Sequence, residues 1–158
     1  MIISVIGAGS CNQEIYDLAE EVGKLIALNG AVLVTGGLGG VMEAASKGAR
    51  EAGGITVGIL PGFSRDEANS YIDIPITTGL SHARNVIVAR SADALIAISG
   101  GYGTLSEIAL ALKAGCPIIL LNSWSIAPHD GRKQPDFLVA RTPEEAVSLA
   151  IKQSQDSK

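Results

Sequence analysis

The amino-acid sequence predicts an α/β fold with a doubly wound, mainly parallel sheet of six or seven strands and helices on both faces. Short apolar segments alternate with helical patterns along the whole chain, and this alternation is typical of parallel βαβ units. The apolar segments are continuous runs, which indicates strands that are covered on both faces. The chain has 158 residues without a linker, repeat or low-complexity segment, so we expect one domain, 1–158.

The strands are expected where short apolar runs give way to glycine, proline or a polar residue. These runs lie at 2–6, 31–35, 55–60, 71–75, 93–98 and 117–121, with a short seventh at 137–139. Helical spacing of apolar and small residues predicts helices near 12–29, 39–52, 81–91, 103–114 and 142–153. Right-handed crossovers bring the carboxyl ends of such strands to one edge, so we expect a Rossmann-like domain with its ligand site there.

The most informative loop follows the strand predicted at 93–98. It is rich in glycine and joins that strand to an apolar helix; its residues are Ser99, Gly100, Gly101, Tyr102, Gly103 and Thr104. Glycine lets backbone N–H groups approach a ligand closely, and the positive end of a helix dipole suits a phosphate. We expect Thr104 to cap the helix, and Glu107 either to complete a capping box with Thr104 or to face the ligand.

Two earlier strands end in loops of the same type. The first strand is followed by Gly7, Gly9 and Ser10, and the second by Gly36, Gly37, Gly39 and Gly40, with Glu43 in the next helix. Three such loops at one edge of a parallel sheet predict a site for a small phosphorylated, nucleotide-like ligand. At that site Glu43 either contacts a ribose hydroxyl or caps its own helix.

The composition argues against several other partners. The formal net charge is −4 and there is no basic run, so nucleic acid is not an expected partner. No apolar run reaches the roughly 18–20 residues of a membrane span, and we see no signal peptide, so no membrane partner is expected. Cys11 and Cys116 are predicted at opposite ends of the sheet, too far apart for a disulfide, and free thiols favour a cytoplasmic location.

Motifs for several reaction classes are also missing. His82 and His129 have no carboxylates at metal-ligand spacing, so no metal site is expected, and neither a serine-hydrolase elbow nor a Walker loop occurs. The loop after the first strand lacks the third glycine of the dinucleotide fingerprint, which disfavours NAD. No lysine follows a strand to serve as the Schiff-base partner of pyridoxal phosphate, so we expect no cofactor and no lysine decarboxylase activity.

The glycine motifs resemble those of the LOG-like (SLOG) Rossmann superfamily. The similarity covers about residues 3–121 and is carried by Gly36-Gly37 to Gly40-Val41-Met42-Glu43 and by Gly100 to Glu107. That superfamily contains the "lonely guy" cytokinin-activating phosphoribohydrolases, proteins labelled "possible lysine decarboxylase", and molybdenum cofactor carrier proteins. The segment Ser81-His82-Ala83-Arg84-Asn85 and the pair Ser106-Glu107 are most similar to the carrier-like branch.

This resemblance implies roles for two charged residues and two alternative functions. The basic and acidic residues that the hydrolases use match Arg84 and Glu107, which are therefore the candidate catalytic pair. Ser99 stands where the hydrolases carry proline, and Asn85 stands where they carry lysine. These departures favour a carrier-like protein that binds a phosphorylated pterin such as molybdopterin; the alternative is a nucleoside 5′-monophosphate phosphoribohydrolase, which releases the base and ribose 5-phosphate.

Two further features concern assembly and ring binding. The predicted helix carries apolar residues around most of its circumference between Leu105 and Leu112, so we expect either a homo-oligomer, dimer or tetramer, or a helix that is central in the monomer. The long segment 122–136 follows a strand at the ligand edge. Its Trp124 either stacks on a base or pterin ring or anchors the segment, and Phe63 is a second stacking candidate.

Overall fold

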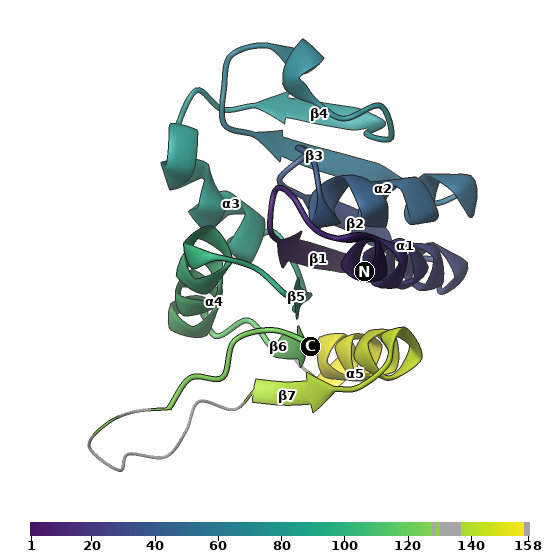
Figure 1. Ribbon diagram of the computed structural model, residues 1–158, viewed down its shortest axis with the longest axis vertical. Coiled ribbons are helices and arrows are strands. Elements are labelled where there is room, and N and C mark those ends of the chain that lie inside the picture. Colours follow the sequence, from purple (N-terminus) through teal and green to yellow (C-terminus); the bar gives the residue numbers. More distant parts are fainter. Residues whose placement is uncertain (128, 130–136, 157–158) are drawn as a thin grey trace.

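Seven strands form one parallel sheet in the computed structural model, which describes residues 1–127, 129 and 137–156. The order across the sheet is β4-β3-β2-β1-β5-β6-β7 (Figure 1). The strands are β1 (Ile2–Gly7), β2 (Val32–Thr35), β3 (Thr56–Leu60), β4 (Ile74–Thr77), β5 (Ala94–Ile98), β6 (Ile118–Leu121) and β7 (Phe137–Ala140). Every neighbouring pair is parallel, which confirms the predicted Rossmann-like sheet and its short seventh strand.

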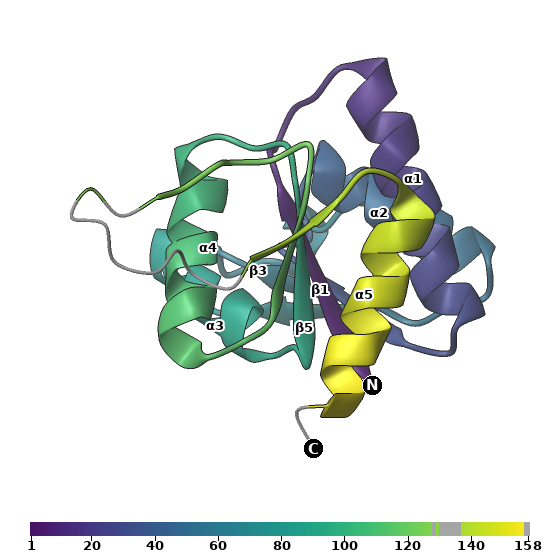
Figure 2. The ribbon, with the colours of Figure 1, turned by 90° about the horizontal axis from the view of Figure 1, so that it is seen from below.

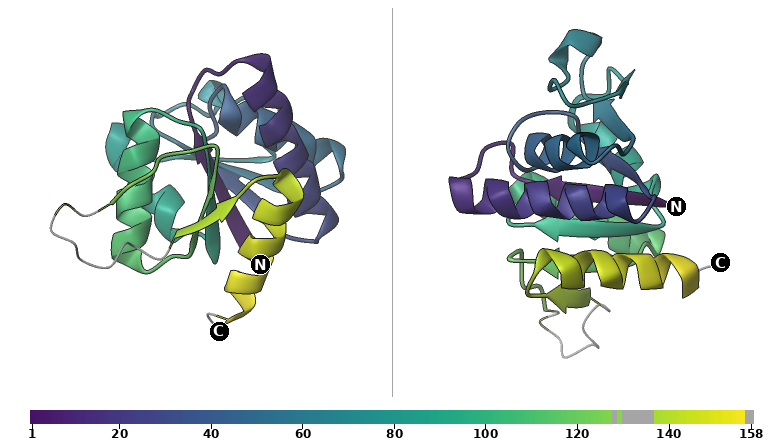
Figure 3. Two further views of the ribbon diagram at one scale, coloured as in Figure 1. Left: turned by 60° about the horizontal axis from the view of Figure 1, so that its bottom comes forward. Right: turned by 90° about the vertical axis from the view of Figure 1, so that its right-hand side faces the viewer.

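Helices cover both faces of this sheet, as the alternation of patterns predicted. One face carries α1 (Gln13–Leu28), α2 (Val41–Glu51) and α5 (Pro143–Asp156), and the other carries α3 (Asn85–Arg90) and α4 (Tyr102–Ala114) (Figures 2 and 3). Two short 3-10 helices, η1 (Arg65–Glu67) and η2 (Ser81–Arg84), precede β4 and α3. The outer strands are less covered than the central ones, because Ile74 and Ile76 of β4 and Val139 of β7 stay exposed.

Two predicted elements begin later than expected. The strand predicted at 71–75 lies at 74–77, because Asn69 closes a turn by accepting a hydrogen bond from the N–H of Tyr71 to its side chain at 3.0 Å. The helix predicted at 81–91 begins as the 3-10 helix η2 and becomes α-helical only at Asn85. Ser81 has a φ of +50°, a left-handed conformation in which an α-helix cannot start.

The core consists of two apolar clusters, one on each face of the sheet. Ile3 and Val5 of β1 pack with α1, α2 and α5, whereas Ile6 packs with α3 and α4. All five residues of β5 are buried, as a strand with helices on both faces requires. Because this packing holds β1 and β5 in place, their carboxyl ends lie next to each other at one edge of the sheet. The candidate site lies at that edge.

Candidate functional site

The carboxyl ends of β1 and β5 lie side by side in the middle of the sheet. Gly7, the last residue of β1, is paired with Ile98, the last residue of β5. The chain then leaves β1 toward α1 on one face and leaves β5 toward α4 on the other (Figure 2). Open α/β sheets bind their ligands at a switch point of this kind.

The guanidinium of Arg84 lies against the backbone of Gly36 at this edge. A Cβ atom on Gly36 would come within 2.6 Å of Nη2 and closer still to Nη1, so no other residue fits there without moving Arg84. The Arg84 side chain comes from the end of η2 and is 7% exposed. Its Nε and Nη1 atoms are buried and have no hydrogen-bond partner among the described residues. A buried charged group without partners is costly, and these two donors are suited to an acceptor from a bound anion.

Glu107, in the second turn of α4, shares this enclosed space with Arg84. Its side chain is also 7% exposed, and burial raises the pKa of its carboxyl to about 7, an effect that the positive charge of Arg84 partly opposes. Burial likewise lowers the pKa of Arg84, and Glu107 opposes that shift. Within the described part of the chain, however, the two groups do not form an ion pair. The Arg84 cation therefore remains available to an anion.

The start of α4 differs from the prediction. The helix begins at Tyr102 with Gly101 as its N-cap, and no side chain caps it, so Thr104 is not the N-cap and the Thr104–Glu107 capping box is not formed. The physical reason is Gly100, whose φ of +109° turns the chain into the helix before Thr104 is reached. Thr104 is 2% exposed and packs against Gly100, where a Cβ would clash with its side chain.

The amino end of α4 therefore has free backbone N–H groups and open space before it. Among the described residues no side chain caps the helix, and Cβ atoms on Gly101 or Gly103 would meet nothing within 4 Å. Tyr102 between them is 85% exposed. Unpaired N–H groups at the positive end of a helix dipole are suited to an anionic ligand.

Two non-glycine residues at this edge have left-handed backbones. Ser99 follows β5 with a φ of +50°, and Asn122 follows β6 with a φ of +49°. The two segments are linked, because the hydroxyl of Ser123 donates a 2.7 Å hydrogen bond to the carbonyl of Ser99. Strained backbone conformations persist where the surrounding structure holds them, and they are concentrated at binding sites.

The first two glycine loops are packed against each other. The N–H of Val41 donates to the carbonyl of Ala8 at 3.0 Å, and Gly40, with a φ of +63°, lies so close that a Cβ would clash with that carbonyl. Gly7 is required by packing, since a Cβ would lie 2.6 Å from the carbonyl oxygen of Ile98. Gly9, in contrast, faces open space. These two loops lie at the carboxyl edge of the sheet, and Arg84 and Glu107 lie on its α3/α4 side.

Comparison with known protein families agrees with this geometry. The model of the SLOG cluster4 family matches residues 1–147, nearly the whole chain. The chain belongs to this family. It is a LOG-like SLOG protein with a Rossmann-like sheet, as the sequence motifs predicted.

Three similar proteins illustrate the two branches of the superfamily. The molybdenum cofactor binding protein of Rippkaea orientalis has a TM-score of 0.86 at 43% identity, covering 96% of this chain and 94% of that one. The Moco carrier protein of Chlamydomonas reinhardtii has a TM-score of 0.84 at 41% identity, covering 99% and 98%. A cytokinin riboside 5′-monophosphate phosphoribohydrolase of Mycobacterium tuberculosis is 37% identical over 127 residues, covering 74% of this chain and 67% of the relative.

Sequence reasoning missed two features of the site in this SLOG protein. The contact between Arg84 and Gly36 joins residues that are distant in the chain, and no local pattern encodes it. The left-handed backbone at Ser99 was also missed, because serine is not a residue type that signals this conformation. The position of Gly36 directly after a buried strand was the available signal for a close contact there. It did not identify Arg84 as the residue in contact.

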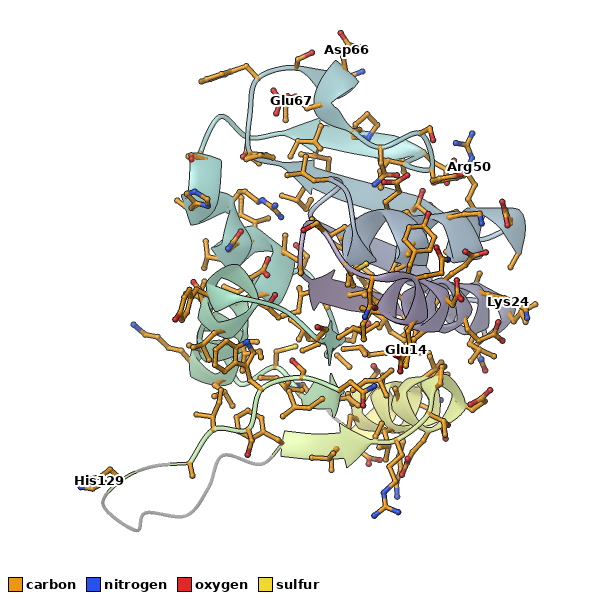
Figure 4. The ribbon with its side chains drawn as sticks, in the orientation of Figure 1. Glu14, Lys24, Arg50, Asp66, Glu67 and His129 are labelled. Atoms are coloured by element: carbon orange, nitrogen blue, oxygen red, sulfur yellow. The ribbon has the colours of Figure 1, made fainter. Side chains whose placement is uncertain are left out.

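Several charged side chains of this SLOG protein lie away from α3 and α4. Figure 4 shows Lys24, Arg50, Asp66 and Glu67 at the periphery, Glu14 at the start of α1, and His129 on the segment after β6, far from α3. Among the described residues no cluster of histidine, cysteine, aspartate and glutamate could hold a metal ion.

Both cysteines are free, and burial raises the pKa of each thiol, that of Cys116 to about 11. In the described part of the chain, no helix combines the length and hydropathy that crossing a membrane requires.

Proposed function

We propose that this SLOG protein binds a small phosphorylated, nucleotide-like ligand at the carboxyl edge of its sheet, as a carrier-like binding protein for a phosphorylated pterin such as the molybdenum cofactor. The observation that carries the proposal is the guanidinium of Arg84, which is 7% exposed and has two unpartnered nitrogens. A phosphate would supply the missing acceptors, and guanidinium is the side chain best shaped to bind phosphate with two parallel hydrogen bonds.

The glycine loops complete this proposed site. The uncapped amino end of α4 offers N–H groups to the phosphate from Gly101, Tyr102 and Gly103. In this proposal the ligand lies between the Gly36 to Gly40 loop, with Glu43, and the loop that contains Ser99, Gly100 and Thr104. Gly7, Gly9 and Ser10, after the central strand β1, complete the site. Backbone donors explain how a chain with a net charge of −4 can bind an anion.

The carrier function is favoured over the hydrolase function by two residues of the site. Ser99 has a φ of +50°, which a proline cannot adopt, so this loop does not take the form that a proline at that position would impose. Asn85 is largely buried and neutral where the hydrolases carry a lysine. The likeness of the whole chain to two molybdenum cofactor binding and carrier proteins supports the same choice.

The hydrolase alternative rests on Glu107. Hydrolysis of an N-glycosidic bond places positive charge on the sugar ring, and a nearby carboxylate stabilises that charge or activates water. Glu107 is enclosed beside Arg84 and has a pKa of about 7, so it is present in both protonation states near neutral pH. The 37% identity to a phosphoribohydrolase keeps this activity as the second candidate.

Binding and turnover of 5′-AMP by the purified protein separate these alternatives. We expect calorimetry to show binding of 5′-AMP and of inorganic phosphate that is at least about tenfold weaker in Arg84→Gln, equivalent to the loss of one charged hydrogen bond. Arg90→Gln is the matched control, because Arg90 ends the next helix, α3, and is exposed. Adenine released from 5′-AMP in a Glu107-dependent manner would establish the hydrolase alternative. If neither ligand binds and no adenine appears, the proposed site is wrong.

Cargo is tested directly on the protein as purified from its expression host. A carrier-like protein is expected to retain a phosphorylated pterin, which oxidation converts to a fluorescent derivative. Its amount should fall in the Arg84→Gln protein and stay unchanged in the Arg90→Gln protein. A pterin content that is equal in both variants would count against Arg84 as the phosphate-binding residue.

We further propose that the protein is a homo-oligomer, dimer or tetramer, assembled through the α3/α4 face. Several large apolar side chains on or beside this face are 37–48% exposed in the single chain, namely Ile74, Ile76, Leu80 and Val86. On α4, Leu110 and Leu112 pack partly against the chain's own core, whereas Leu105 is half-buried and Ala109 is exposed. The apolar remainder of that helix is what a partner subunit would cover.

A further inference from the structure

A cavity lies on the other side of α4 from Arg84, between the end of β6 and the edge strand β7. Its volume is about 440 Å³, within the range of small-molecule sites. Leu120 of β6 is in register with Val139 of β7, and both line the cavity. The strand β7 is the outermost of the sheet and α5 packs on its other face, so the cavity occupies a stretch of sheet that α4 does not reach (Figures 1 and 2).

One wall of this cavity is joined to the glycine loop before α4. The indole N–H of Trp124 donates a 3.2 Å hydrogen bond to the carbonyl of Gly101. The rings of Trp124 and Tyr102 lie 6.1 Å apart between centroids, with an angle of 33° between their planes. The hydrogen bond from Ser123 to the carbonyl of Ser99 is a second attachment. The cavity therefore opens beside the proposed phosphate-binding loop.

The lining combines flat apolar surface with polar groups. Leu120, Ile126 and Phe137 supply apolar walls beside the indole of Trp124, and Asn122, Ser125 and Arg141 supply amide, hydroxyl and guanidinium groups. An aliphatic chain would leave those polar groups unpaired, whereas a planar heterocycle uses both kinds of surface. Its faces stack on an aromatic ring and its ring nitrogens and carbonyls form hydrogen bonds.

We propose that this cavity binds the planar heterocyclic ring of a ligand whose phosphate lies on the Ser99 to Thr104 loop, with Trp124 as the stacking surface. This inference rests on the proposed function, because it identifies the ring-binding part of the same ligand. It makes Trp124 a binding residue and gives Gly101 two roles. The carbonyl of Gly101 holds the indole, and its α-carbon leaves the start of α4 open to the phosphate.

The chain offers its own reporter for the test, since Trp124 is its one tryptophan. Four probes are titrated while tryptophan fluorescence and heat are recorded: neopterin and adenosine carry a ring without phosphate, ribose 5-phosphate carries phosphate without a ring, and 5′-AMP carries both. We expect neopterin, adenosine or both to change the fluorescence, and ribose 5-phosphate to bind without a comparable change. For each ring probe that binds, Trp124→Leu should weaken affinity by about fivefold or more, as expected for the loss of one stacked ring.

Two control variants accompany Trp124→Leu. Trp124→Phe should restore most of the affinity, because it keeps an aromatic face. Phe63→Leu tests the other stacking candidate, which is 89% exposed on a different part of the edge; a loss of affinity in Phe63→Leu but not in Trp124→Leu would overturn the inference. The ribose 5-phosphate affinity should be insensitive to Trp124→Leu and sensitive to Arg84→Gln.

The outcomes distinguish this inference from the proposed function. If ribose 5-phosphate binds through Arg84 but neither ring probe alters the fluorescence, the phosphate site stands and the ring cavity is wrong. If ring probes bind but no phosphate compound does, the ring cavity stands and the proposed function fails. If ring probes bind equally well to Trp124→Leu, the inference is overturned. It is also overturned if the fluorescence changes only with protein concentration, because a second chain then covers the indole.

Discussion

The guanidinium of Arg84 occupies the space where every residue except glycine would place its Cβ at position 36. The strand β2 delivers Gly36 to the ligand edge, and η2 delivers Arg84 from beyond β4, so the contact joins two parts of the fold. The arrangement buries a cation with two unsatisfied nitrogens and keeps it close to Glu107. Such a costly group is retained where function needs it.

Gly36→Ala should therefore act through Arg84. The added methyl group clashes with the guanidinium, so we expect the side chain to be displaced, ligand affinity to fall at least about tenfold, and unfolding free energy to fall by about 1–3 kcal/mol. A double-mutant cycle with Arg84→Ala, read by calorimetry with 5′-AMP, checks the mechanism. In the Arg84→Ala background the alanine at 36 should cost no further affinity. Additive losses would show that Gly36 contacts the ligand directly.

The pKa of Glu107 predicts a pH dependence of stability. The carboxyl has a pKa of about 7 when folded, against an ordinary value of 4.5, so the folded protein holds a proton that the unfolded chain releases. The stabilisation of the folded state by this proton is complete below pH 4.5 and is lost as the pH rises to about 7. The rise of this pKa from 4.5 to about 7 corresponds to at most about 3.5 kcal/mol of unfolding free energy.

The matched variant for this effect is Glu107→Gln, which is neutral at every pH. Urea unfolding of both proteins at pH 5 and pH 8 isolates the contribution of Glu107, since all other titrating groups are shared. We expect the variant to gain stability relative to the natural chain as the pH rises, by about 2–3 kcal/mol between these values. A constant difference across that range would mean that Glu107 titrates as an ordinary exposed carboxyl.

The loop after β5 gives a third prediction, at Ser99. Proline fixes φ near −65° and has no N–H, whereas Ser99 has a φ of +50° and donates its N–H to the carbonyl of Leu121 at 3.3 Å. Ser99→Pro should thus lower the free energy of unfolding by more than about 1 kcal/mol and weaken phosphate binding. Ser99→Gly, which accepts this φ without strain, should retain both properties. Full binding by the proline variant would mean that the loop readily takes the other conformation.

The sequence predicted the regular elements well because apolar runs and helical spacing follow directly from burial. The places where it misled have local causes. Asn69 closes a turn, so β4 begins three residues later than predicted. Gly100 turns the chain so that α4 begins before Thr104, the predicted N-cap. The pair Arg84 and Glu107 was found by motif resemblance, but its dependence on Gly36 arises from tertiary packing, which no window of sequence contains.

The last prediction concerns the exposed apolar surface of α4. Ala109 is exposed at the middle of this helix, with Leu105 and Leu112 half-buried on either side, and Val86 of α3 is 37% exposed nearby. A partner subunit that covers this surface would bury on the order of 1,600 Å² or more, enough for a stable assembly. Ala109→Glu would place a charge in that interface, so sedimentation at micromolar concentration should show a shift to monomer.

The control for assembly is Leu28→Glu, which adds the same charge at the end of α1 on the opposite face, where Leu28 is 63% exposed. That variant should sediment like the natural chain. Because α4 also carries Glu107 and the uncapped phosphate-binding turn, the Ala109→Glu monomer is expected to bind 5′-AMP more weakly if the partner helps to enclose the site. Unchanged binding by a monomeric variant would mean that the site is complete within one chain. A natural chain that sediments as a monomer would remove the interface altogether and leave the apolar face of α4 exposed in solution.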